Sequence, residues 1–332
     1  MKKYHVYGMG NALVDLEYHV DIDFFHSNNI AKGLMTLIEE ERHYELFRTL
    51  GLAQAEKMAC GGSAANSIIA VAQLGGKSFY SCKVANDSFG KFYLKDILKN
   101  AVETNLEEKT LDDGQTGKCI VMVTPDADRT MNTYLGVTSN FSSEQLDLDA
   151  LKNSQYLYVE GYLVTSPSGR EAMIKAKKYA QENGVRVSLT LSDPGIVAGF
   201  KKYFKEIIGS GVDLIFCNES EAISFTETKS LEEAREAMKK YAKTFAITQG
   251  AEGATLYDGK NFLQVEPFAI KAVDTLGAGD MFAGAFLYAL THGHSFADSG
   301  RLASLASSSV VGQFGPRLDA QQLVAVKKKI FK

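Results

Sequence analysis

The chain has 332 residues, of which 45% are hydrophobic and 23% are charged, a composition typical of a folded globular protein and unlike that of a disordered chain. Its net charge is −4, so it lacks the excess of Lys and Arg that non-specific nucleic-acid binding requires. The longest clearly apolar stretch, Met281 to Leu290, is shorter than the roughly 20 residues of a membrane span. We therefore expect neither a nucleic-acid partner nor a membrane partner.

The cysteines are scattered and none forms a CxxC motif; they are Cys60, Cys82, Cys119 and Cys217. This scatter is typical of reduced thiols in a cytoplasmic protein and not of a disulfide framework or a zinc site. The first residues also lack the apolar core of a signal peptide. We expect a cytoplasmic location.

The first third of the chain alternates strand and helix patterns. A core strand is predicted at 5–8, and the strict apolar/polar alternation from Val14 to Val20 predicts a half-exposed strand. The segments that follow predict a helix at 63–74, a strand at 77–85 and a helix at 89–101.

A hairpin is predicted in the next segment, where apolar runs at 117–124 and 129–136 flank the polar turn 126–128. With the strand at 13–20 and the segment 34–38, this hairpin would form a small separate sheet. We expect this lid to comprise 11–38 and 115–138. The remaining ranges, 1–10, 39–114 and 139–332, would form a large α/β domain.

From residue 155 onward, strands and helices alternate regularly. Strands are predicted at 155–163, 185–191, 213–217 and 245–248, with a hairpin at 254–257 and 262–265. Helices are predicted at 169–183, 199–208, 231–242, 278–292, 296–312 and 319–331. Strands separated by helices indicate an α/β fold in which a mostly parallel sheet is covered on both faces.

The segment 274–280, Asp-Thr-Leu-Gly-Ala-Gly-Asp, leads directly into an almost wholly apolar helix. Gly277, Ala278 and Gly279 leave the backbone N–H groups of the helix N-terminus uncovered, and such a terminus binds anions such as phosphate. Asp280 in the first turn would repel a phosphate, so its position is unexpected if the site only binds phosphate. The position is explained if Asp280 takes a proton from a hydroxyl that attacks the phosphorus. An ordinary Asp helix cap is the alternative.

A second glycine cluster, Gly61-Gly62-Ser63, also opens a helix and lets a ligand approach the backbone closely. Asn66 lies about one turn inside this helix, where its amide can donate to and accept from a sugar diol. A helix N-terminus capped by Ser63 remains an equally good interpretation.

Polar residues follow two later strands. Asn218 and Glu221 come after the strand at 213–217, where they could hold Mg²⁺ through water or serve as a helix cap. Thr248, Gly250 and Gly253 follow the next strand and predict a nucleotide loop or a plain turn. The motifs GxGxxG, Walker A, HExxH and GxSxG are missing from the sequence.

Together these segments resemble the ribokinase-like (pfkB-type) family of carbohydrate and nucleoside kinases, and most of all its adenosine kinases. The DTxGAGD segment carries the resemblance most specifically, although Leu276 stands where Thr or Asn is commoner. The resemblance implies a three-layer α/β sandwich with a small β lid. It also implies that ATP and Mg²⁺ take part in the reaction.

The resemblance also implies roles for individual residues. Asp280 matches the general base, 277–279 the backbone anion hole, and Arg129 an arginine that reaches the phosphates. Asp274 matches the border of a monovalent-cation site, such as one for K⁺, near Gly315. Substrate binding is assigned to Asn11, Leu13, Asp15, Gly62, Ser63, Asn66, Met131 and Tyr162, and nucleotide binding to Asn218, Glu221, Thr248, Gly250 and Gly253, with Asn218 and Glu221 also holding Mg²⁺ through water.

The implied activity is phosphorylation of the 5′-hydroxyl of a nucleoside, with adenosine as the first candidate. A sugar kinase of the same family, acting on ribose, fructose or a keto-deoxy sugar acid, is the first alternative. Its pocket would carry extra polar or cationic groups in place of a base site. A non-catalytic nucleoside-binding protein is a second alternative, and both a monomer and a homodimer are compatible with the sequence.

Overall fold

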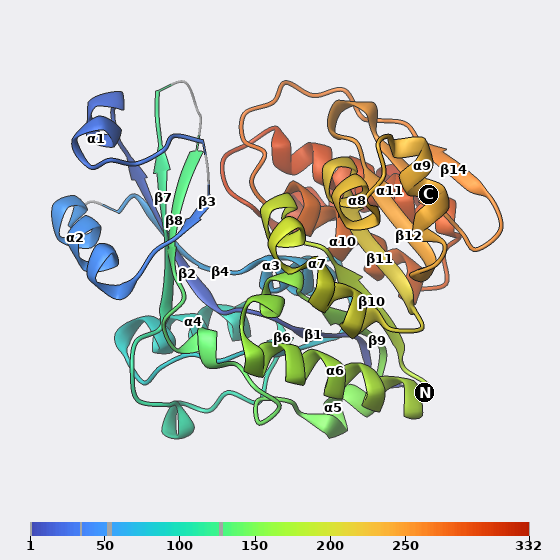
Figure 1. The fold of residues 1–332 in the computed structure, drawn as a ribbon, viewed down its shortest axis with the longest axis horizontal. Coiled ribbons are helices and arrows are strands. Elements are labelled where there is room, and N and C mark those ends of the chain that lie inside the picture. The colour runs from blue at the N-terminus through green and yellow to red at the C-terminus, as the bar shows by residue number, and fades with distance from the viewer. Residues whose placement is uncertain (1, 34, 52–54, 126–128, 332) are drawn as a thin grey trace.

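The computed structural model describes residues 2–33, 35–51, 55–125 and 129–331, which form two sheets (Figure 1). The larger sheet has nine strands in the order β14-β13-β12-β11-β10-β9-β1-β5-β6. The smaller sheet has five strands in the order β3-β8-β7-β2-β4. The small sheet stands beside the large domain and faces it across a groove.

The large sheet is parallel from β6 to β12, as the alternation of strand and helix patterns predicts. An antiparallel hairpin ends it at one edge, formed by β13 and β14. The strands are β1 (Tyr4–Met9), β5 (Ser78–Ser81), β6 (Val102–Glu103), β9 (Ser154–Val159), β10 (Arg186–Thr190), β11 (Val212–Asn218), β12 (Ala242–Thr248), β13 (Ala254–Tyr257) and β14 (Phe262–Val265).

Helices cover both faces of this sheet, each over its own hydrophobic core. One layer contains α3 (Ser63–Gln73), α4 (Ser88–Lys99), α10 (Ala278–Thr291), α11 (Phe296–Val311) and α12 (Ala320–Ile330). The other contains α5 (Leu148–Lys152), α6 (Pro167–Glu182), α7 (Pro194–Ile208), α8 (Glu219–Thr226) and α9 (Leu231–Met238). The fold is the expected three-layer α/β sandwich. Short 3₁₀ helices lie at η2 (Glu108–Thr110), η3 (Gly136–Asn140), η4 (Gly161–Thr165) and η5 (Gly250–Glu252).

The small sheet contains the predicted hairpin, in which β7 and β8 pair antiparallel. The turn at 126–128 and Leu34 lie outside the described residues. The strands are β2 (Leu13–His19), β3 (Met35–Leu37), β4 (Lys57–Gly61), β7 (Gly117–Val123) and β8 (Arg129–Tyr134). Two helices, α1 (Ile22–Ser27) and α2 (Glu40–Leu50), cover the face that points away from the large domain.

Strand β4 corrects the expected division of the chain. The sequence pattern places 39–114 in the large domain, but β4 pairs antiparallel with β2, from Leu13 opposite Gly61 to Glu17 opposite Lys57. The small sheet therefore takes strands from three separate stretches of the chain. The segment Lys-Met-Ala-Cys-Gly shows no apolar alternation, so its sequence pattern does not predict a strand. It forms β4 at the edge of the small sheet because tertiary contacts specify its pairing.

The cysteines are free and buried, as the sequence predicts. Within the described ranges, no helix is both long enough and apolar enough to cross a membrane.

Candidate active site

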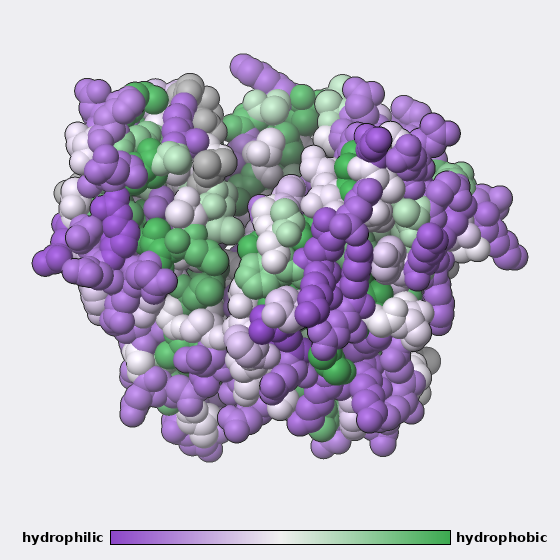
Figure 2. Space-filling view, in the orientation of Figure 1, coloured by the Kyte–Doolittle hydropathy of each residue, from purple (hydrophilic) through white to green (hydrophobic). Residues whose placement is uncertain are grey.

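A cavity of about 390 Å³ lies between the small sheet and the large domain. Figure 2 shows the groove that leads to it, with apolar residues exposed along both sides. Several lining residues stand where parallel strands end: Glu160 after β9, Thr190 in β10, Asn218 in β11 and Thr248 in β12. The carboxyl ends of parallel strands are where open α/β sheets bind ligands.

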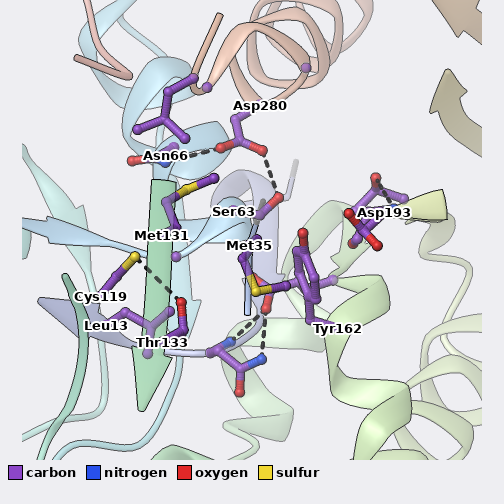
Figure 3. Close-up of a pocket in the computed structure, with 18 of the residues that line it drawn as sticks. Leu13, Met35, Ser63, Asn66, Cys119, Met131, Thr133, Tyr162, Asp193 and Asp280 are labelled. Atoms are coloured by element: carbon purple, nitrogen blue, oxygen red, sulfur yellow. Dashed lines mark hydrogen bonds between the residues drawn. The ribbon is translucent and has the colours of Figure 1, made fainter. Parts of the chain in front are cut away.

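Asp280 lies in the first turn of α10 and is held by two residues of α3 (Figure 3). The Ser63 hydroxyl donates to Asp280 Oδ1 at 2.6 Å, and the Asn66 amide donates to Oδ2 at 3.0 Å. Burial raises the pKa of Asp280 to about 6, and the hydrogen bonds from Ser63 and Asn66 and the charge of Arg317 oppose that rise. The carboxylate is therefore fixed in place and mostly ionised at neutral pH.

The N-terminus of α10 has no side-chain cap. Its N-cap residue, Gly277, has φ +74, and a Cβ there would lie 2.4 Å from Pro316 Cβ, so glycine is required. A Cβ on Gly279 would meet nothing within 4 Å, which leaves the backbone of this turn open to the cavity. Gly277 and Gly279 line the cavity, whereas Ala278 does not. This end of a long apolar helix fits an anion such as a phosphoryl group.

Close backbone packing brings β2 and the start of α3 to the same side of the cavity. A Cβ on Gly61 would lie 2.2 Å from an Asp15 carboxylate oxygen, and one on Gly62 (φ +99) would lie 2.2 Å from the Asn11 carbonyl. Burial raises the pKa of Asp15 to about 7, with Arg317 opposing the rise and Asp280 adding to it. The predicted sugar-binding residues therefore lie together; Asn11, Leu13, Asp15, Gly62, Ser63 and Asn66 all line the cavity.

Glu160 is a site residue that the sequence analysis missed. It is 0% exposed, and its Oε1 accepts hydrogen bonds from the Asn11 backbone N–H (3.1 Å) and side-chain amide (3.0 Å). Its Oε2 accepts from the Ala64 N–H at 2.8 Å. Burial raises the pKa of Glu160 to about 7. The strand was expected to run to 163, but it ends at Val159, and a polar residue at the end of a parallel strand is the signal that could have identified Glu160.

The small sheet presents a mainly apolar surface to the cavity. Alternate residues of β2 and β7, such as Leu13, Cys119 and Val121, point into the cavity, while their neighbours pack under α1 and α2. Tyr162 of η4 lies on the opposite, large-domain side (Figure 3). No Lys, Arg or His occurs among the described residues that line the cavity. Residues from the small sheet and its borders are Leu13, Met35, Leu37, Cys119, Val121, Met131, Thr133 and Leu135.

Asn218 and Glu221 form a capping box at the start of α8. Asn218 Oδ1 accepts the Glu221 N–H at 2.8 Å, and the Asn218 amide donates to Glu221 Oε1 at 2.7 Å. Both residues also line the cavity, as does Thr248. Burial raises the pKa of Glu221 to about 7. The two residues thus form the expected helix cap and also line the cavity.

Two predicted nucleotide-loop residues, Gly250 and Gly253, do not line this cavity. Gly253 has φ +82, and a Cβ there would lie 2.1 Å from the Val265 carbonyl, so the tight packing of β13 against β14 accounts for this glycine. Elsewhere in the described chain, no three His, Cys, Asp or Glu side chains are grouped so that they could hold a metal ion. Mg²⁺ bound through waters, one or two carboxylates and phosphates needs no such group.

Arg129 and Asp274 lie outside the cavity lining and form an ion pair with each other. Arg129 Nη2 is 2.9 Å from Asp274 Oδ2, and Arg129 Nη1 is 3.2 Å from Glu17 Oε2. Asp274 also accepts from the N–H groups of Leu276 (3.0 Å) and Gly315 (2.8 Å). The proximity of Asp274 to Gly315 was expected, but the positive charge beside Asp274 is that of Arg129.

Comparisons with known proteins agree with this geometry. The family described as pfkB family carbohydrate kinase matches residues 30–323. An adenosine kinase from Sinorhizobium meliloti superimposes with a TM-score of 0.91 at 35% identity, covering 98% of this chain and 99% of that one. A probable sugar kinase from Rhizobium etli CFN 42 has the same TM-score and identity, covering 99% of each chain.

A sugar kinase is also similar in sequence. A ribokinase from Lactococcus lactis is 31% identical over 276 residues, covering 82% of this chain and 86% of its own length. The resemblance inferred from the sequence motifs is therefore confirmed at the level of the family and the fold. The chain belongs to the pfkB family of carbohydrate kinases, and it is accordingly a phosphotransferase that uses an alcohol group as its acceptor.

Proposed function

We propose that this kinase transfers the γ-phosphoryl group of ATP to the 5′-hydroxyl of a nucleoside, with adenosine as the preferred acceptor. The acceptor oxygen forms a bond to the γ-phosphorus while the bond from that phosphorus to the β–γ bridging oxygen breaks. Asp280 takes the proton of the hydroxyl, and ADP leaves with the electron pair of the broken bond. The products are AMP and ADP when adenosine is the acceptor.

The observation that carries this proposal is that one cavity combines polar side chains suited to sugar hydroxyls with mainly apolar surfaces. Asp15, Asn66 and Asp280 are the polar side chains, and sugar hydroxyls need such hydrogen-bond partners. The small sheet supplies mainly apolar surface on one side of the cavity and Tyr162 supplies an aromatic ring on the opposite, large-domain side, and such surfaces suit a purine ring. A sugar acid would need a cationic partner, and the described lining offers no Lys, Arg or His.

The open N-terminus of α10 would bind the transferring phosphoryl group through backbone N–H groups at Gly277 and Gly279. Asn218, Glu221 and Thr248 line the same cavity and would face the nucleotide, and the first two would hold Mg²⁺ through water. When bound, the ion neutralises phosphate charge. A K⁺ near Asp274 and Gly315 stays a prediction, and the cation that pairs with Asp274 in this structure is Arg129.

Similarity to an adenosine kinase structure supports the nucleoside, while similarity to a ribokinase keeps a free sugar as the second candidate. The first experiment is therefore ADP release with Mg-ATP over adenosine, inosine, guanosine, cytidine, ribose, fructose and 2-keto-3-deoxygluconate, with a no-acceptor control. Turnover that is selective for adenosine supports the proposal. Turnover of a sugar but of no nucleoside would show that the proposed acceptor is wrong, while the proposed phosphotransfer reaction would still hold.

A further inference from the structure

Arg317 lies in the irregular segment between α11 and α12 and reaches the residues that hold Asp280. Its Nε donates to Asn66 Oδ1 at 3.0 Å, and its side chain is only 14% exposed. The preceding residues touch the same region: Gly315 donates to Asp274, and Pro316 packs against Gly277. Three consecutive residues thus contact the segment before α10, its N-cap and the Asn66 amide.

The Arg317 contact decides how the Asn66 amide is oriented. A guanidinium carries donors and no acceptor, so the Asn66 atom facing it must be the carbonyl oxygen Oδ1. The amide nitrogen then points to Asp280 and donates to Oδ2 at 3.0 Å. With the opposite orientation, an amide oxygen would face the Asp280 carboxylate and repel it. The hydrogen-bond chain from Arg317 through Asn66 therefore favours the ionised form of Asp280.

Several other ionisable groups act electrostatically on this carboxylate or are affected by it. The charge of Asp280 adds to the rise in the pKa of two carboxyls, Asp15 on β2 and Glu160 after β9. It also adds to the rise in the pKa of the Tyr158 and Tyr162 hydroxyls. Burial raises the pKa of both Asp280 and Asp15, and the charge of Arg317 opposes that rise. Arg317 thus places a positive charge beside a site that gathers three carboxyl groups.

We propose that Arg317 is a positioning residue for phosphoryl transfer, a proposal that rests on the proposed role of Asp280 as the base. Arg317 orients the Asn66 amide toward Asp280 and supplies the positive charge that keeps Asp280 ionised. Arg317 itself does not line the cavity. It acts through Asn66, which the proposed function also places beside the sugar hydroxyls, so its effect on Asp280 is read from the pH dependence of the reaction and not from KM alone.

A purely structural role is the competing explanation. Arg317 Nη1 lies 3.5 Å from Asp96 Oδ2 and Nη2 lies 3.3 Å from Cys60 Sγ, so the side chain could simply anchor its segment to α4 and β4. Asp96→Asn is a matched control, because it weakens this anchor from the other side and leaves the contact with Asn66 in place. An anchoring role predicts similar effects for Asp96→Asn and for substitution of Arg317.

The test measures kcat and KM for adenosine with saturating Mg-ATP from pH 5 to pH 9 in wild type, Arg317→Met, Arg317→Lys and Asp96→Asn. In Arg317→Met, the acid limb of the kcat/KM profile should move up by about one pH unit, since an opposite charge nearby shifts a carboxyl pKa by at least that much. At pH 6, kcat should fall about fivefold, because that pH lies at the wild-type pKa of about 6, with a much smaller change at pH 8.5. In Arg317→Lys the acid limb should return most of the way to its wild-type position, and in Asp96→Asn it should not move.

The outcome that overturns the proposal is a wild-type acid limb in Arg317→Met, or the same limb shift in Asp96→Asn. Thermal unfolding and calorimetric adenosine binding of each variant show whether it is folded and binds the acceptor. If Arg317→Met does not fold, Arg317→Gln and Arg317→Lys are compared instead. An acid limb that is shifted in Arg317→Gln and lies at its wild-type position in Arg317→Lys supports the role, and a wild-type limb in both variants overturns it. Failure of the proposed function is distinct, because the wild-type enzyme would then release no ADP with any nucleoside.

Discussion

Arg129 of β8 and Asp274, which precedes α10, form an ion pair of 2.9 Å that joins the small sheet to the large domain. Their side chains are 7% and 2% exposed, and Glu17 of β2 completes the arrangement at 3.2 Å. In this arrangement the single positive charge of the Arg129 guanidinium pairs with two carboxylates, and Arg129 does not line the cavity. To reach a phosphate, Arg129 would have to leave both partners.

We predict that Arg129→Met destabilises the protein strongly, because it leaves Asp274 and Glu17 buried without their cation. Breaking a buried ion pair from one side costs about 3–5 kcal/mol. Glu17→Gln keeps the pair with Asp274 and should cost much less. Urea unfolding of both variants measures the difference. Equal stabilities would show that the Arg129–Asp274 pair contributes little.

We predict that Asp280→Asn lowers kcat by about a hundred- to ten-thousand-fold, the usual contribution of a positioned general base. Adenosine affinity, measured by calorimetry, should be largely retained, because the sugar partners Asp15 and Asn66 remain. Ser63→Ala removes one donor to the same carboxylate and should cost far less turnover. Near-normal turnover in Asp280→Asn would refute the assignment of the base.

We predict that Tyr162→Ala raises the KM for adenosine about tenfold, since loss of a base-stacking aromatic side chain costs about 1–3 kcal/mol. If a ribose reaction is detectable, its KM should not change, because free ribose has no base. Phe262→Ala on the edge strand β14 is the control, since Phe262 is 38% exposed and does not line the cavity. A parallel rise in the KM for ribose would place Tyr162 against the sugar instead.

The pH dependence of stability should reveal the buried carboxyls. The pKa of Glu160 is raised to about 7, so between about pH 4.5 and pH 7 the native state keeps a proton that the unfolded chain has lost. This group therefore stabilises the fold at low pH, and that contribution disappears as the pH rises through 7. His43, whose pKa burial lowers to about 4, acts in the opposite sense, so wild type alone is ambiguous.

The decisive quantity is the difference in the pH slope of unfolding free energy between wild type and Glu160→Gln. Removing one such proton should make the slope between pH 5 and pH 6.5 less negative by about 1.4 kcal/mol per pH unit. Guanidinium unfolding at several pH values measures it. Identical slopes would mean that Glu160 is ionised in the native state throughout this range.

The helix-opening glycine segments could be found from the sequence because their chemistry is local. Asp280 and Ser63 each stand beside small residues at the start of an apolar helix, and the structure brings them within 2.6 Å. Arg317 could not be found in this way. Its segment has no periodicity, and its partners Asn66, Cys60 and Asp96 come from three other elements. The pairing of β4 with β2 escaped prediction for the same reason, because only the folded neighbours specify it.

The small sheet pairs strands that lie far apart in the chain, and this has a consequence for the synthesis of the protein. Strand β2 leaves the ribosome early, yet it pairs along its whole length with β7, whose first residue, Gly117, lies opposite Leu13. Until that segment emerges, the apolar residues of β2 lack their neighbour, and contacts so distant in the chain form slowly. Nascent chains that stall before β7 would therefore expose the unpaired edge of β2, and we expect chaperones to bind at this stage of synthesis.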